Sequence, residues 1–454
     1  MRLTLADVFV ALGYRSAVNP GQSGPVFTSV STDTRTLKRG ALFIALANER
    51  HDGHEHISHA IRAGATGVIV SKEVVVSRDV PAIKVPDSTV AYGLIGRYWR
   101  DKFAIPVVGV TGSVGKTSTK ELLGTMLQCL GPVVKTTESQ NTETGVPRTL
   151  LTIDTNHRSA VVEMGMRGKG QIADLCQIAS PTIGVVTLIG DNHIELLGSR
   201  QAIAEAKSEL IAALPIHGLA VLPADDPYFS LLAAPARCPV RSFGLSAAAD
   251  IRADHSERVN AGWKFSVGGT PVYLPSPSKH EIVNSLAGFA VAEALGCSRE
   301  QVAAALAEYQ SPPMRMEVIR TSSGVIILND AYNAAPDSLA SSLKTLVEYS
   351  GTRKFAFIGD MRELGQHTVA AHQRIGDLIE ELGGLDGLIT VGNSAAVIGR
   401  ATARFETSEE AADYADNAVS FREGDVILVK GSRAVAMERV VEALQGAMKG
   451  PLSS

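Results

Sequence analysis

The sequence predicts an α/β protein of three domains, and three observations support this prediction. The chain has 454 residues, a length that suggests about three domains of ordinary size. Short apolar runs alternate with helical patterns in two separate stretches, which is typical of parallel sheets covered by helices. A new strand-like segment begins at Ile105, and the two prolines at 312–313 should stop any helix, so the chain divides at these two positions. We therefore predict domains at 1–103, 104–311 and 312–454.

The amino-terminal region is expected to form a small α/β domain. Its apolar segments at 41–46 and 67–70 are short and lie among polar turns. Asp7 interrupts the apolar stretch at the start of the chain, and no small-residue cleavage site follows clearly, so a secretory signal is not expected.

The central region is expected to form a parallel sheet with a helix at 199–213. A broken, polar stretch at 249–275 predicts a small antiparallel insert, and an Ala-rich helical pattern follows at 281–308. The strands that we expect are at 105–110, 159–164, 183–189 and 219–224.

The third region repeats the alternation and predicts a Rossmann-like open sheet. Such sheets place ligands beyond the carboxyl ends of their strands. The elements that we expect are strands at 324–330, 354–360, 387–392 and 425–431 and helices at 338–349 and 434–447.

Composition excludes several classes of protein. The 43 Lys and Arg residues nearly balance the 47 Asp and Glu residues, so no strongly basic nucleic-acid surface is expected. No apolar run approaches the roughly 18–20 residues that cross a bilayer, so membrane insertion is not expected. The four cysteines are 47 to 62 residues apart, which favours reduced thiols and a cytoplasmic protein. We also expect a monomer.

The most informative motif follows the strand expected at 105–110. Gly112 and Gly115 enclose a tight turn at the start of a helix, where backbone N–H groups and the helix dipole favour an anion. Lys116 adds a positive charge for the β- and γ-phosphates, and the Thr117 hydroxyl is suited to Mg²⁺. We predict a nucleotide-binding loop comprising Thr111, Gly112, Ser113, Val114, Gly115, Lys116, Thr117 and Ser118.

The loop departs from the usual G-x-x-x-x-G-K-[ST] pattern, because Val110 stands where the first glycine is expected. The string T-G-S-x-G-K-T instead resembles the P-loop of the Mur ligases, ATP-dependent amide-forming enzymes of peptidoglycan precursor synthesis. The resemblance extends along nearly the whole chain. Glu163 in VVEMGM, His193 in DNHIELLGS and Lys207 in EAKSEL match the family's acidic residue, histidine and often carbamylated lysine.

This resemblance implies roles for these residues. Lys116, Glu163, His193, Lys207 and Arg315 would be catalytic, and Thr117, Glu163 and His193 would organise Mg²⁺. Asn284 in KHEIVNSLAG would face the adenine, with Glu281 in place of the family's first Asn. Arg315 would approach the γ-phosphate and Asp330 would hold the ribose, so that ATP bridges two domains and domain closure assembles the site.

The third region indicates which members of the family are most similar. NDAYNAAPDS at 329–338 and GDMRELG at 359–365 resemble the members that add D-alanyl-D-alanine to UDP-N-acetylmuramoyl-tripeptide, although Ala335 replaces a usual Asn. The reaction implied is phosphorylation of the substrate carboxylate by ATP, followed by attack of the dipeptide amine. The general base for that amine stays open, with Asp337 and Asp360 as candidates. The substrate-binding residues implied are Asp33, Thr34, Arg35, Tyr332, Asn333 and Asp337.

Four alternatives stay open. The chain could be a Mur-type ligase with another incoming amino acid, or a P-loop nucleotide switch without ligase activity. The histidines between His51 and His59 could bind a metal, although their spacing is not H-E-x-x-H. The string at 168–173 fits G-x-G-x-x-[GA], but it begins four residues after the strand-like run ends, which disfavours dinucleotide binding.

Overall fold

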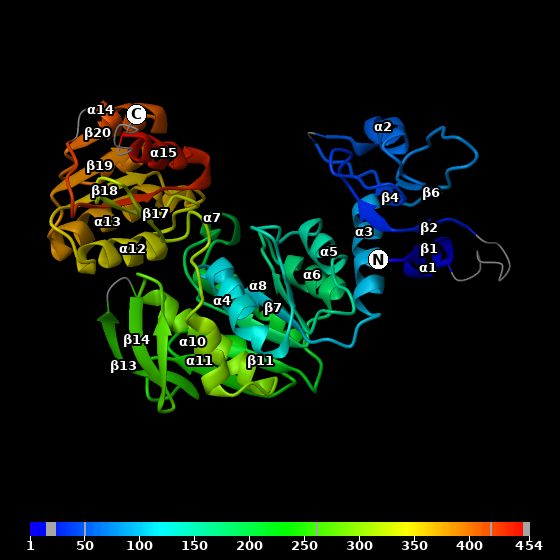
Figure 1. The fold of residues 1–454 in the computed structure, drawn as a ribbon, viewed down its shortest axis with the longest axis horizontal. Helices are drawn as coiled ribbons and strands as arrows, with labels where there is room; N and C mark the ends of the chain where they lie inside the picture. The colour runs from blue at the N-terminus through cyan, green and yellow to red at the C-terminus, as the bar shows by residue number, and fades with distance from the viewer. Residues whose placement is uncertain (15–23, 50, 260–261, 418–419, 448–454) are drawn as a thin grey trace.

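The structure is a computed structural model that describes residues 1–14, 24–49, 51–259, 262–417 and 420–447. Figure 1 shows three domains in a row. The amino-terminal domain (blue) contacts one side of the central domain (cyan to green), and the carboxyl-terminal domain (yellow to red) lies on the other side. The predicted three-domain α/β fold is confirmed.

The amino-terminal domain contains a four-stranded parallel sheet in the order β3-β4-β5-β6. All residues of β4 and β5 are buried, which agrees with the two apolar segments found in the sequence. A second, two-stranded ladder pairs β1 with β2. The elements are β1 (Leu3–Thr4), α1 (Leu5–Ala11), β2 (Val26–Phe27), β3 (Ser29–Ser31), β4 (Ala41–Ile44), η1 (Gly53–His56), α2 (Ile57–Arg62), β5 (Gly67–Val70), β6 (Ala82–Lys84) and α3 (Ser88–Arg100).

The central domain is built on a nine-stranded sheet in the order β15-β14-β13-β12-β11-β10-β7-β9-β8. Its strands are β7 (Val107–Thr111), β8 (Val133–Lys135), β9 (Ser159–Glu163), β10 (Ile183–Val186), β11 (Leu219–Pro223), β12 (Val240–Gly244), β13 (Ile251–Val259), β14 (Gly262–Val267) and β15 (Thr270–Leu274). The antiparallel insert exists, but it is not separate from the main sheet. β13 pairs in parallel with β12 through Phe243 and Ile251, so the insert extends the same sheet.

Helices cover both faces of this sheet. Along β7, Val107 packs with α5, α6 and α8 in one core, and Val108 packs with α4, α10 and α11 in the other. This alternation is the two-residue period of a strand buried on both faces. The helices are α4 (Lys116–Met126), η2 (Leu127–Leu130), α5 (Gly145–Leu150), α6 (Gln171–Ala179), α7 (Ile194–Leu197), α8 (Arg200–Ala212), α9 (Phe229–Ala233), α10 (His280–Ala294) and α11 (Arg299–Leu306).

The helical pattern at 281–308 forms two helices, not one. Leu295 ends α10, Gly296 has a φ of 93°, and Ser298 caps α11 through a hydrogen bond from the Gln301 N–H group. A positive φ is accessible to glycine at little cost, so Gly296 sets the position of the break.

The carboxyl-terminal domain has a six-stranded sheet in the order β16-β17-β21-β18-β19-β20, with β16 as its antiparallel edge. The four predicted strands form its parallel core, while the short edge strands β16 and β20 were not predicted. The elements are β16 (Glu317–Arg320), β17 (Ile326–Asp330), α12 (Pro336–Glu348), β18 (Lys354–Gly359), η3 (Gly365–His367), α13 (Thr368–Leu382), β19 (Gly387–Val391), η4 (Ala395–Val397), β20 (Ala403–Phe405), α14 (Ser408–Asn417), β21 (Val426–Lys430), η5 (Arg433–Val435) and α15 (Glu438–Ala447).

Two of the cysteines that were expected to be reduced form a disulfide in the structure. Cys129 and Cys297 are 168 residues apart in sequence, and their Cα atoms are 6.4 Å apart. Cys129 follows α4 and Cys297 follows α10, and these two helices pack against each other. The sequence prediction was wrong because spacing along the chain does not report which helix ends meet in space.

We expect the Cys129→Ser variant to lose about 2–4 kcal/mol of unfolding free energy, because the disulfide restricts the unfolded chain over a long loop. Urea unfolding of the oxidised wild type and the variant measures this difference. Added reductant should bring the wild type to the variant's midpoint and leave the variant unchanged. A wild type that is insensitive to reductant would contradict the prediction.

The histidines near residue 54 have structural partners. The His54 ring accepts a 2.9 Å hydrogen bond from the Ser71 N–H group at Nε2, and its Nδ1 lies 2.5 Å from an Asp52 oxygen. Among the described residues, no three His, Cys, Asp or Glu side chains gather as a metal site would require. The described part of the chain also contains no helix of the length and apolarity that a membrane span needs.

Candidate active site

The P-loop connects β7 to α4 and depends on two glycines. Gly112 has a φ of 149°, and a Cβ atom there would lie 1.8 Å from the Thr187 hydroxyl oxygen. Gly115 has a φ of 87°, and its Cβ would lie 2.8 Å from the Asn284 side chain. Both positions therefore require glycine. The loop directs the N-terminus of α4 toward a cavity, where its free N–H groups favour an anion.

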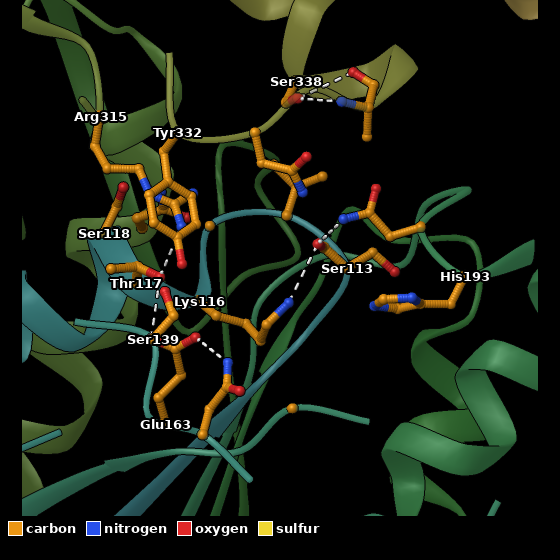
Figure 2. Close-up of a pocket in the computed structure, with 18 of the residues that line it drawn as sticks. Ser113, Lys116, Thr117, Ser118, Ser139, Glu163, His193, Arg315, Tyr332 and Ser338 are labelled. Atoms are coloured by element: carbon orange, nitrogen blue, oxygen red, sulfur yellow. Dashed lines mark hydrogen bonds between the residues drawn. The ribbon is translucent and has the colours of Figure 1, made fainter. Parts of the chain in front are cut away.

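That cavity has a volume of about 860 Å³ and lies between the central and carboxyl-terminal domains. Figure 2 shows the P-loop residues below Arg315 and Tyr332, with Glu163 and His193 at opposite sides. The predicted residues that line it are Ser113, Val114, Gly115, Lys116, Thr117, Ser118, Glu163, His193, Lys207, Asn284, Arg315, Asp330, Tyr332 and Asn333.

Lys116 and Lys207 converge on one atom. The Gly112 carbonyl oxygen accepts a 2.7 Å hydrogen bond from Lys116 Nζ and a 2.8 Å hydrogen bond from Lys207 Nζ. Burial lowers the pKa of Lys116. Burial, together with the Lys116 charge, lowers the pKa of Lys207 well below its usual value. Two adjacent ammonium groups in a buried site repel each other. This repulsion favours binding of a polyanionic ligand, or loss of a proton from one of the two lysines.

Glu163 ends β9 and is almost fully buried at 1 % exposure. Its carboxylate accepts a 3.0 Å hydrogen bond from the Thr117 hydroxyl and a 2.7 Å hydrogen bond from the Asn141 side-chain amide. Sequence reasoning missed Asn141. The only indication of Asn141 in the sequence is that it lies in the polar run between β8 and α5. The carboxylate and the P-loop hydroxyl are thus held together as two oxygen donors.

His193 lies on the opposite side of the cavity, with a φ of 65°. Its Nδ1 is 2.9 Å from a Glu363 oxygen of the third domain, although the two groups are not aligned as a hydrogen bond. Burial lowers the pKa of His193 to about 4, Glu363 opposes this shift, and the nearby Lys116 and Lys207 add to it. The imidazole is therefore neutral at pH 7 and has a lone pair available for a ligand.

Arg315 brings the third domain to the P-loop. Its Nη2 donates a 3.2 Å hydrogen bond to the Thr117 hydroxyl, across 198 positions of sequence. Its guanidinium lies 4.0 Å from the centre of the Tyr332 ring, a cation–π contact that fixes its orientation. The predicted convergence of these two domains on one nucleotide loop is present in the structure.

Asp330 ends β17 and already has several partners. Its carboxylate accepts hydrogen bonds from Lys430 Nζ at 2.6 Å, the Ser342 hydroxyl at 2.7 Å and the Met316 N–H group at 3.2 Å. Lys430 also donates a 2.9 Å hydrogen bond to the Asn333 carbonyl, so it fixes the loop that carries Tyr332. Sequence reasoning missed Lys430, although it ends a predicted strand beside Asp330.

Several predicted residues lie outside the cavity lining. The Thr111 hydroxyl donates to the Met164 carbonyl at 2.9 Å and is fully buried. Asp337 lies 3.7 Å from Arg200 across the domain boundary, and burial raises its pKa. The amino-terminal candidates are also outside the lining, and they form a local ion pair, Asp33 with Arg35, beside Thr34.

A smaller cavity of about 190 Å³ adjoins the first and shares Asn192, His193 and Asn333 with it. Arg362 and Arg433 of the third domain line it, and both guanidinium groups are more than half exposed. Its remaining lining residues are Ala334, Glu363, Leu364, Ser432 and Ala434. Arg362 lies 3.0 Å from an Asp360 oxygen and Arg433 donates a 2.6 Å hydrogen bond to Glu438, so a small carboxylate ligand would bind through the remaining N–H groups of the two guanidinium groups.

The G-x-G string at 168–173 does not offer a phosphate site. A carboxylate already occupies the N-terminus of α6, because Glu209 accepts hydrogen bonds from the Gly170 N–H group at 2.7 Å and the Ala173 N–H group at 3.1 Å. A bound phosphate would be repelled by this charge.

Comparison with known proteins agrees with this geometry. Three family models match the chain: the catalytic domain of the Mur ligase family at residues 26–92, the Mur ligase middle domain at 110–292, and the glutamate ligase domain of Mur ligases at 314–433. The chain belongs to the Mur ligase family. The P-loop, Glu163, His193 and Lys207 of this Mur ligase all fall within the middle-domain match.

Its curated relatives cover nearly the whole chain. It is 38% identical to the UDP-N-acetylmuramoyl-tripeptide–D-alanyl-D-alanine ligase of Synechocystis, over 92% of this chain and 91% of that protein. It is 32% identical to the Bacillus subtilis enzyme of the same name, over 96% of each chain.

Solved structures of similar proteins have the same fold. The Mur ligase aligns with a crystal structure of MurF from Acinetobacter baumannii at a TM-score of 0.89 and 28% identity, covering 98% of this chain and 99% of the other. It aligns with MurF from Thermotoga maritima in complex with ADP at a TM-score of 0.83 and 30% identity, covering 92% and 97%.

Proposed function

We propose that this Mur ligase joins D-alanyl-D-alanine to UDP-N-acetylmuramoyl-tripeptide, with conversion of ATP to ADP and phosphate, in peptidoglycan precursor synthesis. One observation supports this most strongly. A single cavity combines a P-loop with Glu163, His193 and Lys207 of the central domain and Arg315 of the third domain. A nucleotide switch would not need this set of groups, and the names of the relatives support the choice of substrates.

The first step is transfer of the γ-phosphoryl group to the terminal carboxylate of the tripeptide. A carboxylate oxygen forms a bond to the γ-phosphorus as the bond to the ADP oxygen breaks. Phosphoryl transfer needs positioning and charge neutralisation more than covalent help from the protein. Lys116 and the amides of the P-loop hold the phosphates, and Arg315 neutralises charge from the third domain.

The donors around Thr117 fit Mg²⁺, which prefers oxygen ligands. The Thr117 hydroxyl oxygen is 3.0 Å from the Glu163 carboxylate, so both oxygens are placed to contact one ion, and His193 has a neutral ring nitrogen without a hydrogen bond. Thr117 and Glu163 would hold this ion, which would neutralise charge on the transferred phosphate, and His193, on the opposite side of the cavity, would hold a second ion.

Lys207 is suited to carbamylation. Its amine is buried and its pKa is lowered, so the neutral form that reacts with CO₂ is favoured. The amine nitrogen would bond to the carbon of CO₂ and lose one proton. The resulting carbamate would add an anion beside Lys116 and supply oxygens for a metal ion.

The second step is attack of the dipeptide amine on the acyl-phosphate. The amine nitrogen bonds to the acyl carbon, the carbon–oxygen bond to phosphate breaks, and the amine loses a proton. We assign the dipeptide to the smaller cavity, where Arg362 and Arg433 are suited to its carboxylate and Ala334 and Ala434 to its methyl groups. Asp337 and Asp360 line neither cavity, so neither is placed to accept the amine proton directly.

We expect Arg433→Ala to raise the KM for D-alanyl-D-alanine about tenfold and to leave the KM for ATP within about twofold, because one charged hydrogen bond contributes about 1.5 kcal/mol. Initial rates at varied dipeptide concentration measure this. Arg404→Ala on β20 is the matched control and should behave as wild type. A tenfold rise in the KM for ATP instead would mean that Arg433 contacts the nucleotide and not the dipeptide.

We also propose that the protein acts as a monomer, and its use of ATP supports the cytoplasm as the compartment. The function is tested by phosphate release from ATP and Mg²⁺ with UDP-N-acetylmuramoyl-tripeptide, with and without D-alanyl-D-alanine. Release that needs both, with a product mass equal to the sum of the two minus water, supports the proposal. Release only with another amine would identify a different Mur-type ligase, and release without any peptide substrate would favour the nucleotide switch.

A further inference from the structure

Lys120 is a buried cation one helical turn after Lys116, and the reaction described above does not use it. It lies in α4, is fully buried and does not line the nucleotide cavity. Its Nζ donates a 2.7 Å hydrogen bond to the Thr136 carbonyl and a 2.9 Å hydrogen bond to the Glu138 carbonyl. A carboxylate oxygen of Glu121 lies 2.9 Å from the same Nζ. An ammonium group has three N–H donors, so each of them has an acceptor within the fold.

The two carbonyl groups belong to the segment 136–141, which leads from β8 to the cavity. Glu138 has a φ of 51°, a left-handed conformation that is unfavourable for a residue with a side chain. The hydrogen bond from Lys120 to the Glu138 carbonyl stabilises this turn. Directly after the turn, Ser139 and Asn141 line the cavity. The turn that Lys120 holds therefore decides where these two side chains lie.

The same segment contacts Glu163 at two points. The Thr136 hydroxyl accepts a 3.0 Å hydrogen bond from the Glu163 N–H group, and the Asn141 side-chain amide donates a 2.7 Å hydrogen bond to Glu163 Oε1. The Asn141 carbonyl also accepts a 2.8 Å hydrogen bond from the Gly165 N–H group. Both the main chain and one carboxylate oxygen of Glu163 are thus fixed by residues whose backbone Lys120 holds.

Glu163 is therefore connected to α4 by two routes. The Thr117 hydroxyl contacts Glu163 Oε2 directly, and Lys120 reaches Oε1 through Asn141. Residues three positions apart lie on the same face of a helix, so one face of α4 sets the position of both carboxylate oxygens. The direction of the carboxylate is in this way tied to the helix that carries the P-loop.

We propose that Lys120 is a positioning residue, which holds the segment 136–141 so that Asn141 orients the Glu163 carboxylate toward Mg²⁺. The inference rests on the proposed magnesium site at Thr117 and Glu163. It gives Lys120 no contact with the ion, the nucleotide or the peptide substrates. Removal of a group that orients a metal ligand typically lowers metal affinity by about 10–100-fold.

The sign of the effect separates positioning from charge. Mg²⁺ removes two negative charges from a nucleotide, so loss of a nearby cation would by charge alone weaken binding of the free nucleotide more than binding of its magnesium complex. Charge alone therefore predicts that nucleotide affinity depends more strongly on Mg²⁺ when Lys120 is removed. Loss of positioning predicts a weaker dependence, because Glu163 is no longer held toward the ion.

The test is the dissociation constant of the β,γ-imido analogue of ATP, measured by calorimetry on the full-length protein with saturating Mg²⁺ and again with EDTA. We define the magnesium factor as the value in EDTA divided by the value in Mg²⁺. This factor should fall about tenfold in Lys120→Met. Lys135→Met is the matched control, because Lys135 pairs with the same Glu121 carboxylate from a more exposed position, and it should keep the wild-type factor.

A double-mutant cycle with Asn141→Ala tests the route from Lys120 to Glu163. Asn141→Ala alone should also lower the magnesium factor about tenfold, because it removes the hydrogen bond to Glu163 Oε1. If Lys120 acts through Asn141, the double variant should lower the factor little further. Independent effects would instead multiply, to about a hundredfold loss.

A lower factor in Lys120→Met and Asn141→Ala, without multiplication in the double variant and without change in Lys135→Met, supports the proposal. An unchanged or higher factor in Lys120→Met, an unchanged factor in Asn141→Ala, multiplied effects, or an equal loss in Lys135→Met overturns it and leaves the proposed function intact. A wild type that binds the analogue equally with and without Mg²⁺ overturns the inference together with the proposed metal site. A wild type that does not bind the analogue overturns the proposed function as well. If Lys120→Met does not fold, Lys120→Gln replaces it, and its shorter side chain should lower the factor in the same direction.

Discussion

The Lys116→Met variant is expected to release phosphate at least about 10³-fold more slowly than the wild type, the largest effect of any single substitution in this site. Lys116 Nζ now donates to the Gly112 carbonyl, within reach of the anion site at the start of α4. Methionine keeps the length of the side chain but removes the charge that neutralises the β- and γ-phosphates.

The loss should come from chemistry and not from unfolding. Burial lowers the pKa of Lys116, which means that the charged amine is less favourable in the folded protein than in water. Removal of that charge should therefore not lower the melting temperature. Phosphate release under saturating substrates and thermal unfolding are the two measurements. Lys264→Met, an exposed change on β14, is the control. A variant of Lys116 with more than a tenth of the wild-type rate would contradict the assignment of the P-loop.

The Glu163→Gln variant is expected to lose about 10²-fold or more in rate and to require a higher Mg²⁺ concentration. The Glu163 carboxylate now accepts from both Thr117 and Asn141. A glutamine keeps one side-chain oxygen and replaces the other with an NH₂ group, which would face the Thr117 hydroxyl or the Asn141 amide. The negative charge and one oxygen that are suited to Mg²⁺ are therefore lost.

A titration of phosphate release with Mg²⁺ separates this effect from simple instability. The half-saturating Mg²⁺ concentration should rise at least about tenfold for Glu163→Gln, in line with loss of a charged ligand. Glu205→Gln, which removes a partly exposed carboxylate of α8 that pairs with Lys169, should keep the wild-type curve. A reduced rate with an unchanged Mg²⁺ requirement would remove Glu163 from the metal site.

The sequence predicted the parts of the site that follow strands. Thr111 ends β7, Glu163 ends β9 and Asp330 ends β17, and each strand is a buried apolar run followed by a polar residue. Because the carboxyl ends of parallel strands lie at one edge of a sheet, these positions could be inferred without coordinates. The short edge strands β8 and β20 have three residues each, too few for a recognisable pattern.

Contacts between the domains could not be predicted from the sequence alone. His193 of the central domain faces Glu363 of the third domain, and Arg315 of the third domain reaches Thr117 of the central domain. The Cys129–Cys297 disulfide and the Lys430–Asp330 ion pair each lie within one domain, but they also join residues far apart in the sequence. Such pairs depend on how packed elements meet, which local periodicity does not encode. The resemblance to the Mur ligases identified Arg315 as a site residue, but nothing in the sequence indicated that Arg315 contacts Thr117.

The formation of an acyl-phosphate is the central claim, and isotope transfer tests it directly. The terminal carboxylate of UDP-N-acetylmuramoyl-tripeptide is labelled with ¹⁸O and incubated with the enzyme, ATP, Mg²⁺ and D-alanyl-D-alanine, and the released phosphate is analysed by mass spectrometry. The mechanism predicts one ¹⁸O atom in each phosphate, because the carboxylate oxygen that attacked the γ-phosphorus leaves with it. Phosphate without ¹⁸O would mean that water, and not the substrate carboxylate, accepts the phosphoryl group, and would contradict the proposed ligation.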